Sequence, residues 1–264
     1  MSEVPNSGQP EPFDIPSAQP DLPPPGSPVK IHLPAAKPIA TYIIIGLTIL
    51  VYLAQLVSTS LLGGDLPAYL GMKINELIRM GEVWRFITPV LLHDSASPLH
   101  IAFNMYALYA IGRGLEHYSG HLRFVLLYMV AGFAGNVFSF IFSNNPSLGA
   151  STAVFGLVAA EGVFIYRNRQ LFGNQARPML TNIITIVVIN LFIGMMPRVD
   201  NWGHAGGLLG GLAFAWLTGP LYHFEWRDGE FHLQDAREKL PLWAPTLLVL
   251  VGFALLAAAR IAFL

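Results

Sequence analysis

Residues 39–62 read IATYIIIGLTILVYLAQLVSTSLL, a stretch without a charged side chain. A helix needs roughly 20 mostly apolar residues to cross the hydrocarbon core of a bilayer, which is about 30 Å thick. The stretch is long enough, so it is predicted to span a membrane. Working outward from it, hydropathy predicts seven spans in all, at residues 39–62, 98–115, 122–142, 149–166, 179–196, 202–217 and 242–263.

The composition of the whole chain agrees with a membrane protein. Apolar residues make up 53% of the 264 residues and charged residues only 12%, whereas a soluble domain carries about a quarter charged residues. The fold class is therefore predicted to be all-α, a polytopic bundle of membrane helices. The net charge of −1 gives no reason to expect a nucleic acid as partner. The absence of cysteine excludes thiolate nucleophiles and Cys-ligated metals.

The ends of the chain differ from its middle, and three parts are predicted. Residues 1–38 are rich in proline and polar residues, which predicts a disordered tail. Residues 39–219 hold a six-span core, and residues 220–264 hold a loop and one additional C-terminal span. Most Lys and Arg residues lie in segments on the same side as the tail. The positive-inside rule then places the N-terminus in the cytoplasm and the C-terminus outside a cell membrane.

The loop at residues 63–97 is unusually long for a compact membrane protein. Loops of this length are usually functional or partly inserted in the membrane interface. Residues 72–80 are predicted to form an amphipathic helix, and Trp84 and Arg85 follow it. Trp and Arg suit the level of the lipid headgroups, so the pair is interpreted either as an interfacial anchor or as a functional element.

Three of the predicted spans, 98–115, 149–166 and 202–217, are short, rich in Gly and Ala, and contain polar residues. Such helices are expected inside the bundle, away from lipid. All three begin at the same membrane face, and their polar residues lie near the start of each. His100 and Asn104 are four residues apart and therefore share one helical face. Three separate helices thus bring His100, Asn104, Ser151 and His204 to a similar depth.

This group of residues can perform nucleophilic catalysis. A serine needs a base within hydrogen-bond reach, so Ser151 is the candidate nucleophile and His204 the candidate base. His100, Asn104 and the backbone N–H of Ser151 can donate to an oxyanion. Asp200 is expected in the loop before the histidine helix, so a dyad is predicted and not a triad.

Glycines near the candidate base have a packing role. Gly207 and Gly211 form a small-xxx-small face just beyond His204, and such a face lets a second helix approach closely. If that second helix is the Ser151 helix, the close approach brings the histidine within reach of the hydroxyl.

Each residue also has a structural interpretation, and other function classes stay open. Serine in a membrane helix commonly packs against its own backbone, and His100 with Asn104 could form a polar clasp between helices. The chain could be a transporter with a central polar cluster, or an inactive protein that binds membrane helices. No His-Glu-x-x-His motif occurs and no three ligands have metal spacing, so neither a metal nor a cofactor is expected.

Taken together, these motifs resemble those of the rhomboid family of intramembrane serine proteases, over about residues 39–219. The resemblance implies the same roles for Ser151 and His204, and an oxyanion hole lined by His100 and Asn104. It also implies single-span membrane proteins as substrates, cut in or near the membrane, and leaves the oligomeric state open. Thr152 departs from the family pattern, because many members have Gly there. The other residues that carry the resemblance are Trp84, Arg85, Glu116, Gly149, Phe155, Gly156, Gly207 and Gly211, with Phe155 matching an aromatic ring that packs against the histidine.

Overall fold

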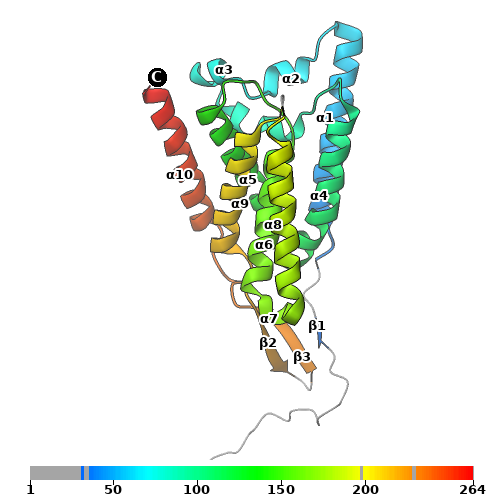
Figure 1. The fold of residues 1–264 in the computed structure, drawn as a ribbon, viewed down its shortest axis with the longest axis vertical. Helices are drawn as coiled ribbons and strands as arrows, with labels where there is room; N and C mark the ends of the chain where they lie inside the picture. The colour runs from blue at the N-terminus through cyan, green and yellow to red at the C-terminus, as the bar shows by residue number, and fades with distance from the viewer. Residues whose placement is uncertain (1–30, 33–35, 197–198, 228–229, 264) are drawn as a thin grey trace, which may run out of the picture.

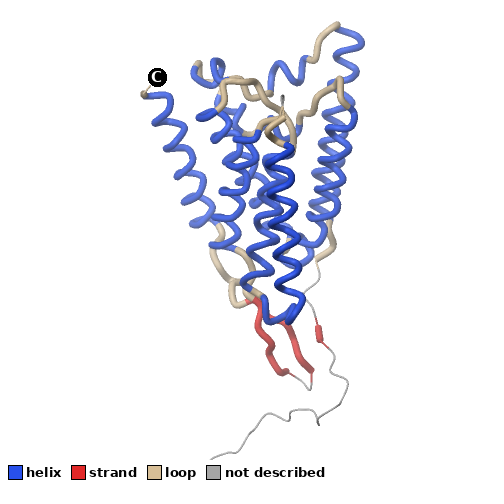
Figure 2. Tube along the Cα trace, viewed as in Figure 1, coloured by secondary structure: helices blue, strands red, loops and turns tan. Residues whose placement is uncertain are grey.

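The computed structural model describes residues 31–32, 36–196, 199–227 and 230–263. Each predicted span is a helix in it (Figure 1). The seven helices are α1 Ile39–Leu62, α4 Pro98–Ser119, α5 His121–Phe142, α6 Ser151–Arg167, α8 Ala176–Ile193, α9 Asn201–Thr218 and α10 Trp243–Ala262. The short helices α7 (Arg169–Phe172) and η3 (Gly173–Gln175) lead into α8. Figure 2 shows a bundle of helices with strands at one end only, so the predicted all-α membrane fold is confirmed.

Four helical segments are long and apolar enough to cross a membrane by length and composition. They are Ile39–Leu62, His121–Phe142, Arg169–Ile193 and Trp243–Ala262. The three helices with the candidate polar residues, α4, α6 and α9, fall outside that criterion, although α4 is 22 residues long. Among the described elements, α5, α6 and α9 pack most closely on one another, and α10 lies against α5 and α9. The polar residues of α6 and α9 are therefore shielded by other helices.

The glycine face of α9 packs against α6. A Cβ added at Gly207 would lie 2.0 Å from the carbonyl oxygen of Thr152, and one at Gly211 would lie 2.3 Å from that of Gly156. No larger residue fits at these positions without moving one helix, because neither contact is with a flexible side chain. This close approach sets the distance between the N-terminal ends of α6 and α9.

Glu116 joins α4 to the start of α1. Its carboxylate accepts the backbone N–H groups of Ala40 and Thr41, each at 2.7 Å, and the Thr41 hydroxyl at 2.6 Å. The first N–H groups of a helix have no partner within the helix, and a carboxylate there is also favoured by the helix dipole. Glu116 thereby caps α1 from a neighbouring helix.

The loop at residues 63–97 folds into four short helices. They are α2 Leu66–Gly71, α3 Asn75–Arg79, η1 Val83–Phe86 and η2 Thr88–Leu91. The single helix predicted over residues 72–80 is too long, because Met72 is extended and Lys73 forms an isolated β-bridge with Ser147. Backbone pairing with a distant segment interrupts the helix, and local sequence does not signal such pairing.

Arg85 lies inside this loop, so its interpretation as an interfacial anchor is wrong. The side chain is buried, and its two terminal nitrogens donate to the carbonyls of Met72 at 2.8 Å and Tyr69 at 2.9 Å. Its Nε donates to Glu82 at 2.7 Å. Trp84 is half exposed and donates from Nε1 to the carbonyl of Leu70 at 3.1 Å. Both residues hold the loop together.

A small sheet at the opposite end of the bundle was not expected from the sequence. Strands β2 (Tyr222–Arg227) and β3 (Glu230–Asp235) pair antiparallel, and β1 (Ile31–His32) pairs parallel with β3. The predicted tail at 1–38 otherwise lies largely outside the described residues, which resume at residue 36.

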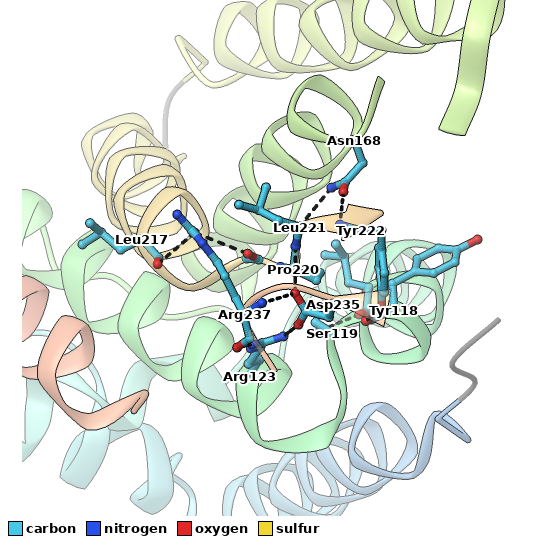
Figure 3. A network of polar contacts seen from close by, with 12 residues as sticks. Tyr118, Ser119, Arg123, Asn168, Leu217, Pro220, Leu221, Tyr222, Asp235 and Arg237 are labelled. Atoms are coloured by element: carbon cyan, nitrogen blue, oxygen red, sulfur yellow. Dashed lines mark hydrogen bonds and ion pairs between the residues drawn. The ribbon is translucent and has the colours of Figure 1, made fainter. Parts of the chain in front are cut away.

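The sheet is fastened to the helix ends by polar contacts (Figure 3). Asp235 pairs with Arg123 of α5, and Arg237 donates to the carbonyl of Leu217 at 3.0 Å. The backbone N–H of Tyr222 donates to Asn168 at 2.8 Å. Arg237 thus supplies a donor to the last carbonyls of α9, which have no partner within the helix.

Candidate active site

Ser151 and His204 meet at one end of the bundle. Ser151 is the first residue of α6, and His204 lies in the first turn of α9. The distance from Ser151 Oγ to His204 Nε2 is 3.0 Å, which is hydrogen-bond geometry for a nucleophile and its base. The structure therefore brings together the two residues that the sequence pointed to on different helices.

The orientation of the His204 ring is fixed by an aromatic neighbour. The ring stacks on Phe155, with 4.1 Å between centroids and 11° between planes. Phe155 is one turn beyond Ser151 on α6, so the same helix supplies the hydroxyl and the supporting ring. The other ring nitrogen, Nδ1, is buried and has no hydrogen-bond partner within the described residues.

Asp200 caps the helix that carries His204. Its Oδ1 accepts the backbone N–H of Gly203 at 2.9 Å, as an N-cap residue does. The carboxylate stabilises the start of α9 and makes no direct hydrogen bond to the imidazole in the described part of the chain. The geometry is that of a serine–histidine pair without a directly bonded carboxylate.

Gly149 leaves the space next to the serine open. Its φ of +134° is a conformation that L side chains rarely adopt. A Cβ placed there would lie 3.0 Å from His100 Nε2 and 3.6 Å from Ser151 Oγ. Both the backbone conformation and the space require glycine, and His100 and Ser151 face the same point.

The donor state of His100 follows from its other contact. His100 Nδ1 accepts the backbone N–H of Asp94 at 3.4 Å, so the neutral ring carries its proton on Nε2, the atom that faces Gly149. Asn104 is buried on the same helix face, and its side-chain amide donates to the carbonyl of His100 at 2.8 Å. One of the two N–H donors of Asn104 is thus used within α4, and the other has no protein partner among the described residues.

Two residues that the sequence analysis did not single out contact this region. His93 is fully buried, and its Nε2 accepts the backbone N–H of Ala150 at 3.4 Å. Gln55 of α1 bonds the backbone of His93 twice, at 3.0 Å and 2.8 Å. A signal was present, because one amide in the middle of an apolar span needs a polar partner.

The long loop holds the segment that leads to Ser151. Gly149 donates its N–H to the carbonyl of Pro89 at 2.9 Å, and Lys73 pairs with Ser147 through two backbone bonds. The Lys73 ammonium is buried and donates to the carbonyl of Asn145 at 2.7 Å. Burial lowers the pKa of Lys73 to about 8.

A polar cleft opens at the same end of the bundle. It has a volume of about 430 Å³ and lies between the end of α5 and the start of α9, with Asp200 and Asn201 in its wall. Among the described residues, no group of three His, Asp or Glu side chains is placed to hold a metal ion.

The fold and the site thus define a polytopic helix bundle of the membrane class in which a serine and a histidine are in contact. The sequence model described as "Rhomboid domain" matches residues 80–221, and the chain belongs to the rhomboid family. The family resemblance seen in the motifs is confirmed.

Several curated relatives are similar to this chain. Rhomboid protease GluP of Bacillus subtilis (strain 168) is 40% identical over 184 residues, which are 69% of this chain and 35% of that protein. RHOMBOID-like protein 1 of Arabidopsis thaliana is 35% identical over 192 residues, covering 69% of this chain and 49% of that protein. RHOMBOID-like protein 5 of the same plant is 37% identical over 171 residues, covering 62% and 54%. The matched region thus spans about a third to a half of these relatives.

Proposed function

We propose that this protein is an intramembrane serine endopeptidase that cleaves single-span membrane proteins in or near the membrane. The observation that carries the proposal is the 3.0 Å contact between Ser151 Oγ and His204 Nε2 at the protected ends of two packed helices. The relative from Bacillus subtilis is named a protease, and it is 40% identical over 184 residues. Membership of the rhomboid family supports the same class of reaction.

In the first half-reaction, Ser151 Oγ attacks the carbonyl carbon of the scissile peptide bond while His204 Nε2 accepts the hydroxyl proton. The carbonyl oxygen becomes an oxyanion. His100 Nε2–H and the backbone N–H of Ser151 are the proposed donors to it, with the free N–H of Asn104 as a third. His204 then gives its proton to the leaving amine, and an acyl-enzyme remains on Ser151.

In the second half-reaction, water attacks the acyl-enzyme. His204 removes a proton from that water, the new carboxylic acid leaves, and Ser151 regains its hydroxyl proton. Water must therefore reach the imidazole. The polar cleft of about 430 Å³ beside the start of α9 supports an aqueous route from this end of the bundle.

A substrate helix needs a lateral way into the bundle, and α8 is the proposed place of entry. This helix packs mainly against α6, and the apolar residues on its outer face are exposed. Ile184 is 62% exposed, Val188 59% and Phe192 75%. A helix with few internal contacts separates from the bundle at lower cost than α5 or α9.

The proposed topology follows the charge distribution. The end of the bundle with the sheet lies in the cytoplasm together with the N-terminus, and the end with Ser151 faces outside, as does the C-terminus. The protein is then a multi-pass protein of the cell membrane that acts without a cofactor.

Cleavage of a single-span reporter by the purified full chain in liposomes tests the proposal. Wild type is compared with Ser151→Ala and His204→Ala, and with the control variants Ser119→Ala and His117→Ala at the far end of α4. We expect wild type and both controls to cut in the presence of a chelator, and both site variants to be silent while folded. Cutting by Ser151→Ala would refute the nucleophile. A folded wild type that binds reporters without cutting them would favour an inactive helix-binding protein, and solute flux would favour a transporter.

A further inference from the structure

Gln55 and His93 form a polar connection from α1 to the segment that carries Ser151. The Gln55 side chain is fully buried within the apolar helix α1. Its Oε1 accepts the backbone N–H of His93 at 3.0 Å, and its Nε2 donates to the carbonyl of the same residue at 2.8 Å. The same Nε2 donates to Asp65 at 2.8 Å. A bidentate contact with one residue's backbone fixes the place of His93 relative to α1.

The contacts of His93 define which of its nitrogens carries the proton. Nε2 accepts the backbone N–H of Ala150 at 3.4 Å, so Nε2 must present a lone pair and the neutral ring is protonated on Nδ1. Burial and the neighbouring His100 lower the pKa of His93 to about 3. The ring therefore stays neutral at ordinary pH and keeps its lone pair for Ala150.

His93 touches both sides of the space where the oxyanion is proposed to form. On one side it accepts the N–H of Ala150, which belongs to the peptide group between Gly149 and Ala150, one residue before Ser151. On the other side its ring lies against the ring of His100, with 5.1 Å between centroids. One buried side chain therefore contacts the peptide before the nucleophile and the imidazole that donates beside it.

We propose that His93, held in place by Gln55, is a positioning residue that keeps the oxyanion donors of the site in the orientation that the reaction requires. The inference rests on the proposed function, because an oxyanion hole matters only where Ser151 attacks a carbonyl. His93 itself need not touch substrate. Its action is to orient the peptide before Ser151 and the ring of His100 ahead of the reaction, since donors act best when they need no rearrangement.

Three substitutions separate this role from simple packing. His93→Phe keeps a planar ring of similar size but has no lone pair for Ala150. His93→Gln restores an acceptor on a smaller side chain, and Gln55→Met keeps the volume in α1 but removes the contacts with the His93 backbone. We expect His93→Phe to lower kcat about tenfold. Loss of one hydrogen bond that positions the donors is taken as about 1.4 kcal/mol, which corresponds to a factor of ten in rate. KM should stay within about twofold.

The matched readouts are kcat and KM on the reporter, the unfolding temperature, and hydrogen exchange of the Ala150 amide. His93→Gln should recover most of the lost kcat, Gln55→Met should lower kcat in the same direction, and His93→Phe should speed exchange at Ala150. An unchanged kcat in His93→Phe, beside a silent Ser151→Ala, would overturn the positioning role alone. An equal loss in His93→Phe and His93→Gln that follows the unfolding temperature would reduce His93 to packing and overturn it too. Absence of Ser151-dependent cleavage in wild type would overturn the proposed function first, while exchange at Ala150 would still report the contact.

Discussion

Gly207 lies where α9 crosses the backbone of α6, one turn beyond His204. In Gly207→Ala the new Cβ would lie 2.0 Å from the carbonyl oxygen of Thr152, whereas an ordinary contact begins near 3.4 Å. The obstacle is backbone, so the helices must move apart by roughly 1.4 Å if nothing else shifts. The Ser151–His204 distance, now 3.0 Å, would then exceed 4 Å, which is outside the range of a hydrogen bond.

The expected effect on the rate follows from that distance. Proton transfer by a positioned base contributes about 10²–10⁴-fold to a rate, so Gly207→Ala should lower kcat by about a hundredfold or more. Gly207→Val should abolish activity, as should Gly211→Val. None of these changes removes a reacting group, so the loss would come from helix spacing.

The assay is reporter cleavage in liposomes, measured beside the unfolding temperature. Gly252→Ala in α10 and Gly46→Ala in α1 are matched controls, because a Cβ at either position meets nothing within 4 Å. Both controls should retain kcat, and they gain slightly in helix propensity. A folded Gly207→Ala protein that cuts at the wild-type rate would refute the argument that backbone contact sets the distance between Ser151 and His204.

Three further predictions concern stability and pH. Arg85→Lys should destabilise the protein by about 1.5–3 kcal/mol for each charged hydrogen bond lost, measured by thermal unfolding. The control is Arg79→Lys, whose original side chain is 33% exposed and whose replacement should change the unfolding temperature little. The pKa of His93 is lowered to about 3 by burial, so the unfolded chain takes up a proton that the folded chain excludes. The contribution of neutral His93 to stability is therefore complete above pH 6.5 and is lost as the pH falls toward 3. The unfolding temperature of wild type should fall more steeply over that window than that of His93→Gln. Arg237→Ala removes a donor to the carbonyl of Leu217 at the end of α9 and should lower the unfolding temperature. The variant should keep its kcat, because this contact is at the end of α9 away from His204. A lost kcat in a folded variant would contradict this.

The spans were predictable because each signal for them is local. Hydropathy requires only that a segment be long and apolar, and the shared face of His100 and Asn104 follows from helical period alone. Helix ends were predicted less well. The fourth span was placed at 149–166, but α6 begins at Ser151, because Gly149 adopts a positive φ that a helix cannot accommodate. The fifth was placed at 179–196, and α8 is Ala176–Ile193.

The elements that the sequence did not reveal depend on contacts between distant segments. The β2–β3 hairpin does carry a local strand signal, because apolar and polar residues alternate along Tyr222–Arg227 and along 230–234. Its place at the helix ends, however, is set by partners such as Arg123, far back along the chain. Likewise, nothing local to Arg85 shows that its donors end on the carbonyls of Tyr69 and Met72. Hydropathy treats Gln55 as one polar residue in an apolar run, although its partner His93 contacts the peptide before Ser151.

The two halves of the candidate site are held by separate sets of contacts. The distance between Ser151 and His204 depends on the backbone packing of α6 against α9, where glycine admits a carbonyl of the opposite helix. The His100 side depends on α1 and the long loop, through Gln55 and His93. In a membrane, association of helices gains little from burying apolar surface, so close backbone contact and buried hydrogen bonds must supply the order that the chemistry needs. This explains why the glycines and the buried amide lie in the very helices and loop that surround Ser151, and why the outer apolar faces of α8 and α10 can vary more freely.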